Sequence, residues 1–273
     1  MANGANKFTW NQDSVNKLVH DASAEIRVVR PLLKLYGQQG NYMPNIVGHR
    51  VVVQKSANML TILGNQNLSP LILSCDIALQ PEQFGDEDAL NTLAVEAAYR
   101  VTAAEDAVIL LGKHAKGFLA HLGVKAEEKQ LDAQTGLLSE APESGRAKGQ
   151  TQTPILDRIV QGIAELQKNG RLGRYAAIVS LDLYQEAMKP RQNPLDAPIY
   201  EIRPLLVENG FRQSQALPPK TGVIFSLGGD GLKIAVPVDT SVEFVEEKKD
   251  VFLQVVEQIR LVVDVPEAVV PLR

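Results

Sequence analysis

The spacing of apolar residues along the chain predicts helices and strands in separate blocks. Apolar residues at every third or fourth position predict helices at 9–31, 86–112, 153–170, 181–189 and 199–210. Alternating or continuous apolar runs predict strands at 49–54, 59–64, 68–79, 174–180, 222–227, 232–238, 241–247 and 251–265. Because helices and strands do not alternate regularly, the pattern indicates an α+β fold.

The ends of the two N-terminal helices carry recognisable signals. Thr9 and Gln12 resemble a capping box, and Pro31 should kink or end the first helix. Asp86 places a carboxylate at the positive end of the second helix, and Gly112 can cap its other end. The second helix holds its period for more than two heptads, so we expect it to be the spine of the molecule.

A Gly-Gly-Asp-Gly run at 228–231 could be a phosphate-binding loop or a tight turn. A phosphate loop needs a helix after its glycines, because backbone N–H groups and the helix N-terminus must converge on the anion. Here a strand pattern follows instead, over 232–238. We therefore interpret the glycines as a hairpin turn between 222–227 and 232–238, and Pro237 as the mark of an edge position.

Two segments lack a clear core of their own. Residues 41–68 are expected to form strands with few apolar residues to bury, and such a β-excursion usually packs on something else. Residues 113–153 are polar and rich in Gly, Ala, Glu, Gln and Lys, which predicts a mobile surface region.

Composition indicates a soluble globular protein. The chain has 273 residues, of which 45% are hydrophobic and 22% charged, and its net charge is −4. This acidic balance argues against a general nucleic-acid binder. The single Cys75 permits no intrachain disulfide and fits a reducing compartment. Neither a secretory signal nor an apolar run of about 18 residues is visible, so we expect a cytoplasmic protein.

Candidate catalytic groups are sparse. The histidines lie apart in the sequence, and no carboxylates or cysteines stand at metal-ligand spacing around them: His20, His49, His114 and His121. Glu105 and Asp106 form an acidic pair within a strongly apolar helix, but neighbours on a helix point about 100° apart and cannot share a proton. We expect buried ion pairs or subunit contacts there, no cofactor or metal, and no enzymatic activity.

Four segments resemble the encapsulins, the shell proteins of bacterial and archaeal nanocompartments. They occur in the family's order: "PLILSCDIALQPEQF" at 70–84, "AAEDAVILLG" at 103–112, "GRLGRYAAIVSLDLY" at 170–184, and a tail that begins "GVIFSLGGDG" at 222 and closes with "PEAVVPL" at 266–272. The chain departs from the family at Arg174, where proline is usual, and in a longer connection around 118–135.

The resemblance implies the Hong Kong 97-type fold of tailed-phage capsids. It divides the chain into a helical arm at 1–40, an extended loop at 41–68, a peripheral domain at 69–153 and 226–273 with its spine helix at 86–112, and an axial domain at 154–225.

The resemblance also implies two sites. A loop lining the five-fold pore falls on Lys189, Pro190, Arg191, Gln192, Asn193 and Asp196. A groove for the short targeting peptide of a cargo protein falls on Trp10, Val15, Leu18 and Val19.

The function that the resemblance implies is structural. Copies of the chain are expected to assemble into an icosahedral shell that encloses a cargo enzyme and passes small molecules through symmetric pores, without membrane or specific nucleic-acid partners. One alternative is a phage or prophage major capsid protein, which has the same fold but DNA as its content. A second alternative is a soluble α+β enzyme whose site is not recognisable from the sequence.

Overall fold

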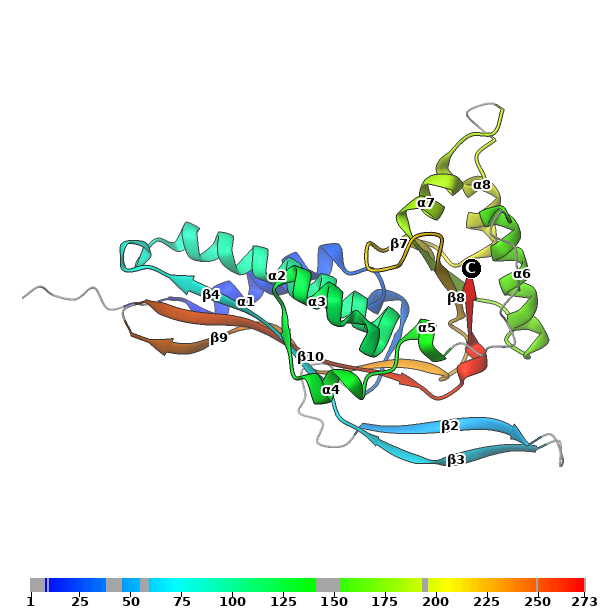
Figure 1. Cartoon of the computed structure of the whole chain (residues 1–273), viewed down its shortest axis with the longest axis horizontal. Coiled ribbons are helices and arrows are strands. Elements are labelled where there is room, and N and C mark those ends of the chain that lie inside the picture. The colour runs from blue at the N-terminus through cyan, green and yellow to red at the C-terminus, as the bar shows by residue number, and fades with distance from the viewer. Residues whose placement is uncertain are drawn as a thin grey trace, which may run out of the picture.

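Two sheets organise the chain, and a two-stranded ribbon projects below them (Figure 1). The computed structural model describes residues 8, 10–37, 46–54, 59–140, 153–192, 196–248 and 250–272. The molecule is elongated, with long helices over a five-stranded sheet at one end and a four-stranded sheet with its own helices at the other (Figure 1). The predicted α+β architecture is thus present, with strands and helices in separate layers.

The five-stranded sheet has its longest strands at the centre. Its order is β1 (Lys34–Leu35), β9 (Leu232–Glu247), β10 (Val251–Val263), β4 (Leu71–Leu79) and β5 (Lys125–Ala126). β10 pairs antiparallel with both β9 and β4, and its side chains are buried or half-buried along its whole length. This largely apolar strand therefore has the central place that its length and composition predict.

Helix α2 (Glu87–Leu111) is the spine that the sequence predicts. The side chain of Asp86 accepts the N–H of Ala89 at its start, and Gly112 ends it with a φ of 59°. Its second half is almost entirely buried, because it packs against α1 (Gln12–Ile26) on one side and against β4 and β10 on another. Small alanines on α2 let these elements approach closely.

Helix α1 begins later and ends earlier than predicted. Asn11 is its N-cap, with its side chain accepting the N–H of Ser14, and Gln12 is the first helical residue. Thr9, the other residue of the predicted capping box, lies outside the described part of the chain. The helix stops at Ile26, before Pro31, and a short 3-10 turn follows. Arg27, directly after α1, and Arg30, the first residue of the 3-10 turn, carry the charges described below.

The four-stranded sheet combines strands from the middle of the chain with the last strand. Its order is β11 (Val269–Leu272), β8 (Gly222–Ser226), β6 (Tyr175–Val179) and β7 (Phe211–Gln213). Three helices pack around it: α6 (Ile155–Lys168), α7 (Leu181–Met188) and α8 (Ile199–Ile202). The predicted helix at 199–210 is wrong beyond its first turn, because a 3-10 turn at Arg203–Leu205, with a proline inside it, follows α8 directly.

The Gly-Gly-Asp-Gly run is a turn, but the predicted hairpin is wrong. β8 lies in the four-stranded sheet and β9 in the five-stranded one, so residues 227–231 connect two sheets. β9 is also one long strand through Pro237, where its pairing with β10 shifts register between Ala235 and Val238. Proline is tolerated at such an irregularity because it cannot donate to the ladder.

The polar segment from residue 113 is folded rather than mobile as far as residue 140. It forms α3 (Lys116–Leu122), β5, α4 (Glu128–Asp132) and α5 (Leu137–Glu140), and it buries Leu119, Leu131 and Leu137. β5 covers part of the edge of β4 by pairing with Leu73 and Ser74. Residues 141–152 lie outside the described part of the chain. A few well-spaced leucines therefore anchor a segment that composition alone marks as loose.

The projecting ribbon consists of β2 (Ile46–Gln54) and β3 (Met59–Leu68). Only its base is anchored: Ile46 is fully buried against Ala235 and Val262, and the N–H of His49 donates to Asp264 at 2.6 Å. Further out, Ile62 is 58% exposed. The expectation that this excursion has little core of its own is confirmed for the residues described.

Two glycines meet back to back where α2 ends, and this contact generates a stability prediction. A Cβ on Gly136 would meet the backbone nitrogen of Gly112 and lie 2.7 Å from the carbonyl oxygen of Leu110. Gly136→Ala should therefore lower the free energy of unfolding by about 1–3 kcal/mol, measured by urea denaturation. Gly117→Ala is the matched control, since nothing lies within 4 Å of its added methyl group. Equal stability of the two variants would contradict this account.

Candidate functional sites

A buried charge cluster lies where α1 ends. Arg27 donates to Glu105 at 3.0 Å, to Glu257 at 2.7 Å and to Asp239 at 2.9 Å, and its side chain is 5% exposed. These carboxylates come from α2, β10 and β9 respectively. One guanidinium therefore joins the end of α1 to three other elements.

Arg30 reinforces the same cluster from the 3-10 turn. Its Nη1 lies 2.9 Å from Asp239 and 2.8 Å from Glu257, with Glu105 at 3.6 Å. Thr240 adds a hydroxyl that contacts both Arg27 and Glu257. The expectation of buried ion pairs at Glu105 is confirmed. The signal for their partners was present in the sequence as two arginines within an otherwise apolar run, "IRVVRPLL".

Asp106 holds the backbone of the same segment. Its carboxylate accepts the N–H of Val28 at 3.0 Å and that of Val29 at 2.8 Å. From the four-stranded sheet, Arg212 of β7 donates to the carbonyl oxygens of Arg27 and Val28 at 3.2 and 3.0 Å. Both sheets are thus attached to residues 27–29.

Burial and neighbouring charges shift the pKa values of these carboxyl groups in opposite directions. Burial, with neighbouring Glu105 adding to it, raises the pKa of Asp106 to about 7. Burial and Glu105 likewise raise the pKa of Glu257 well above its usual range. For Asp239, burial acts in the opposite direction, but the attraction of Arg30 and Arg27 prevails and lowers its pKa to about 2.

Near the start of α1 a small hollow of about 100 Å³ lies between α1 and α2. Of the predicted groove residues, Trp10 and Val15 line it. Val19 is fully buried in the core and Leu18 is half-buried, and neither is among the lining residues.

Aromatic and acidic residues complete this hollow. Phe8 lies between Trp10 and Phe84, with ring centroids 6.4 and 5.8 Å away. Asp86 and Glu87 contribute carboxylates to the wall, and Asp13 lines an adjoining hollow together with Trp10 and Glu87. The sequence analysis interpreted Asp86 only as a signal for the start of a helix. It did not predict that these acidic residues lie beside Trp10.

The predicted pore-loop residues lie at the tip of the four-stranded sheet's helices. Lys189, Pro190, Arg191 and Gln192 are exposed, Asp196 is half-buried, and Asn193 lies outside the described residues. Arg191 pairs with Glu201 at 2.9 Å, and its N–H donates to the carbonyl of Asp196 at 3.3 Å. This loop projects away from the body, beyond α7 and α8 (Figure 1).

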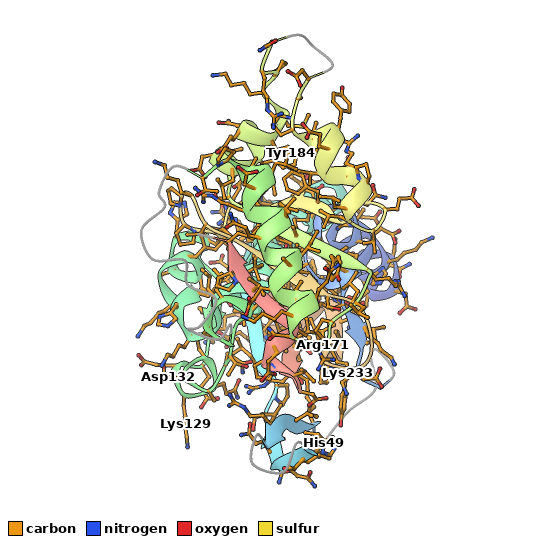
Figure 2. All side chains as sticks on the ribbon, turned by 90° about the vertical axis from the view of Figure 1, so that its right-hand side faces the viewer. His49, Lys129, Asp132, Arg171, Tyr184 and Lys233 are labelled. Atoms are coloured by element: carbon orange, nitrogen blue, oxygen red, sulfur yellow. The ribbon has the colours of Figure 1, made fainter. Side chains whose placement is uncertain are left out.

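The described residues contain no group of three or more metal-ligating side chains that could hold a metal ion. His49 contacts Asn65 on the projecting ribbon, and Figure 2 shows it at the opposite end of the molecule from Tyr184. His20 lies 3.1 Å from Asp239. No helix in the described ranges has the length and apolar content that crossing a bilayer needs.

Solved structures share the fold of this chain. A virus-like particle from Pyrococcus furiosus matches with a TM-score of 0.68 at 15% identity, covering 96% of this chain and 99% of that one. The SrpI encapsulin of Synechococcus elongatus matches with a TM-score of 0.54 at 10% identity, covering 88% and 84%. A Mycobacterium phage Cain structure matches with a TM-score of 0.54 at 14% identity, covering 87% and 84%. The Hong Kong 97-type capsid fold is therefore confirmed.

The sequence itself decides the family. The model of the Linocin_M18 family, described as "Encapsulating protein for peroxidase", matches residues 8–260. The chain belongs to this family of encapsulating proteins. It is thus a shell protein of the encapsulin type, as the four matching segments indicated. No curated protein sequence matches the chain.

The raised pKa of Asp106 predicts how pH affects the stability of this encapsulating protein. A carboxyl group whose pKa rises from 3.8 to about 7 on folding stabilises the protein fully below pH 3.8, and this contribution is lost as the pH rises through 7. For Asp106 alone the loss between pH 5 and pH 8 is roughly 2–3 kcal/mol. Asp239 does not contribute in this window, because its stabilising effect is lost only as the pH falls towards 2.

Asp106→Asn should therefore shrink the difference in unfolding free energy between pH 5 and pH 8 by about 2 kcal/mol. The measurement is urea unfolding at both pH values and one protein concentration. Asp132→Asn, at an exposed position on α4, is the control and should keep the difference of the unmodified protein. If Asp106→Asn retained the full difference, Asp106 would not be the titrating group.

Proposed function

We propose that copies of this chain assemble into a closed icosahedral shell that encloses a cargo enzyme. The observation that carries the proposal is the β2–β3 ribbon, which has strands but almost no core. Its exposed Ile62 and its narrow anchor at Ile46 fit an element that completes its packing on a neighbouring copy. Obligate interfaces of this kind bury roughly 2,000 Å² or more, and they are largely hydrophobic.

Each part of the chain takes a role in this proposal. The ribbon within 41–68 is the extended loop, residues 69–153 and 226–273 form the peripheral domain, and 154–225 form the axial domain. The strand β11, at 269–272, completes the axial sheet instead of the peripheral one. Residues 1–40 supply an N-terminal arm whose helix α1 lies on the peripheral domain.

The pore is proposed at the tip of the axial domain. Lys189 and Arg191 bring positive charge to this tip, whereas Asp196 and Glu201 bring negative charge, and Arg191 is already paired with Glu201. A ring of such loops around a five-fold axis would act on small ions through these side chains. Such a pore would let small substrates pass and would retain the much larger cargo enzyme.

The cargo is proposed to bind through a short targeting peptide in the hollow beside Trp10. Trp10 and Val15 offer apolar contact, and Asp13, Asp86 and Glu87 surround it with negative charge. A peptide with apolar side chains and at least one basic residue fits this chemistry. The family description names a peroxidase as content, and we extend that class of cargo to this chain.

We further propose that the shell itself is not an enzyme and that it assembles in the cytoplasm, without membrane or specific nucleic-acid partners. The buried carboxylates are occupied by arginines and backbone N–H groups, which supports a structural role for them. A reducing compartment suits the single Cys75. Because phage structures share the fold, a capsid that holds DNA is the second candidate.

Assembly tests the proposed function. The purified protein should elute as megadalton particles in size-exclusion chromatography with light scattering, and the ratio of absorbance at 260 and 280 nm should be that of protein. A stable species of the single chain's 29.8 kDa at all concentrations would refute the shell, and particles filled with DNA would favour the capsid.

The ribbon can be tested by a single charge. Ile62→Lys should convert most particles into smaller species, because burying an unpaired ammonium between copies is strongly unfavourable. Gln66→Lys adds the same charge at an exposed polar position of the same strand and should leave assembly intact. Particles that form equally well in both variants would remove the ribbon from the proposed interface.

The groove has its own test. Trp10→Ala should reduce the amount of co-purifying cargo about tenfold without preventing particle formation, because a central aromatic anchor often contributes most of a docking site's affinity. Cargo is quantified by mass spectrometry of purified particles. The control is Leu172→Ala, which removes an exposed apolar side chain between α6 and β6. Unchanged loading in the Trp10 variant would place cargo binding elsewhere.

A further inference from the structure

A second cavity, of about 300 Å³, lies where the two sheets of the molecule are joined. It is enclosed by the end of α1, by α2 and α3, and by residues 213–216 that follow β7. Ile26, Val28, Phe118 and Leu122 form an apolar wall. Its volume is at the lower end of the range for small-molecule sites. None of its lining residues belongs to the proposed cargo groove or to the proposed pore loop.

Asp106 is the one ionisable side chain that lines this cavity among the described residues. It is 4% exposed, and each of its oxygens accepts a single backbone N–H, from Val29 and from Val28. A carboxylate oxygen can accept a second hydrogen bond. The cavity therefore offers a desolvated acceptor beside an apolar wall, and Gln213 and Gln215 are also among its lining residues.

The charges around Asp106 favour a cation. Among the described residues, the hydrogen bonds to Asp106 come from backbone N–H groups and not from a basic side chain. Arg27 and Arg30 are directed to Glu105, Glu257 and Asp239, and Arg212 donates to backbone carbonyl oxygens. An anion in the cavity would meet a buried carboxylate, whereas a positive group would balance it.

We propose that this cavity binds a small amphipathic amine, whose ammonium group donates to Asp106 and whose apolar body lies against Phe118 and Leu122. The charge-assisted hydrogen bond fixes the head of the ligand. The ring of Phe118 favours an aromatic or alkyl body and attracts a cation near its face. Because the cavity joins α1, α2 and α3 to the segment after β7, an occupied site also ties the two sheets together.

The test compares two probes that differ only in the head group. Phenethylamine and 2-phenylethanol are titrated into purified full-length protein and followed by isothermal calorimetry. We expect saturable binding of the amine with a Kd of roughly 0.1–1 mM, as suits a fragment-sized ligand, and at least tenfold weaker binding of the alcohol. Equal affinity for both probes, or no saturable binding of the amine, would overturn the proposal.

Two variants locate the binding. Asp106→Asn should abolish the preference for the amine. Ala103→Leu places a larger side chain in the cavity wall without changing any charge, and it should weaken both probes. This second variant keeps the test decisive if Asp106→Asn fails to fold. Amine binding that survives both substitutions would overturn the proposal.

This proposal stands apart from the shell function. A protein that forms no particles can still be titrated with both probes, and a shell that forms normally can still fail to bind the amine. The two results are therefore read separately.

Discussion

The structure depends most on the buried ion pairs of Arg27 and Arg30. Removing one partner of such a network strands the others in the interior, which typically costs about 3–5 kcal/mol, so its geometry is strongly fixed. The end of α1, the middle of α2 and the paired strands β9 and β10 are held by these contacts. Through Arg212, the four-stranded sheet is attached to the same backbone segment. These contacts fix how α1 lies on α2, and so they position both the hollow beside Trp10 and the cavity beside Asp106.

In a shell protein, such a buried ion-pair cluster can hold the two sheets at a constant relative orientation. Interfaces between copies demand that the two sheets keep a constant relative orientation, because a small tilt would be multiplied around a closed particle. Apolar packing alone tolerates sliding, whereas hydrogen-bonded charges have one satisfied arrangement. The ribbon differs from this arrangement: it is held at its base through Ile46 and Asp264, and Ile62 further out is exposed.

The sequence predicted those elements whose signal is local and long. The 25-residue helix α2 and the strands β4 and β10 were found because apolar residues recur along most of their length. The hairpin predicted at Gly228–Gly231 was wrong because β8 and β9 lie in different sheets and do not pair with each other. Nothing near these glycines indicates which sheet each flanking strand joins. Glu105 was flagged by its apolar surroundings, but Arg27 lies 78 residues away and Asp239 further still, so their meeting could not be read. Trp10 and Val15 line the hollow beside α1, whereas Val19 is buried in the core, and the cargo groove stays a prediction. The family resemblance could not tell which side of the helix faces the core.

The arrangement of the final strands has a consequence for the timing of synthesis. β10 is the middle strand of one sheet and β11 an edge strand of the other, and both are made after every element they pair with. A ribosome-bound chain lacking residues 251–272 thus has two open sheets and cannot present a finished surface. Folding must wait for contacts between distant parts of the chain, which is characteristically slow. A copy of the chain therefore cannot take its place in a shell until its last residues have been synthesised and paired.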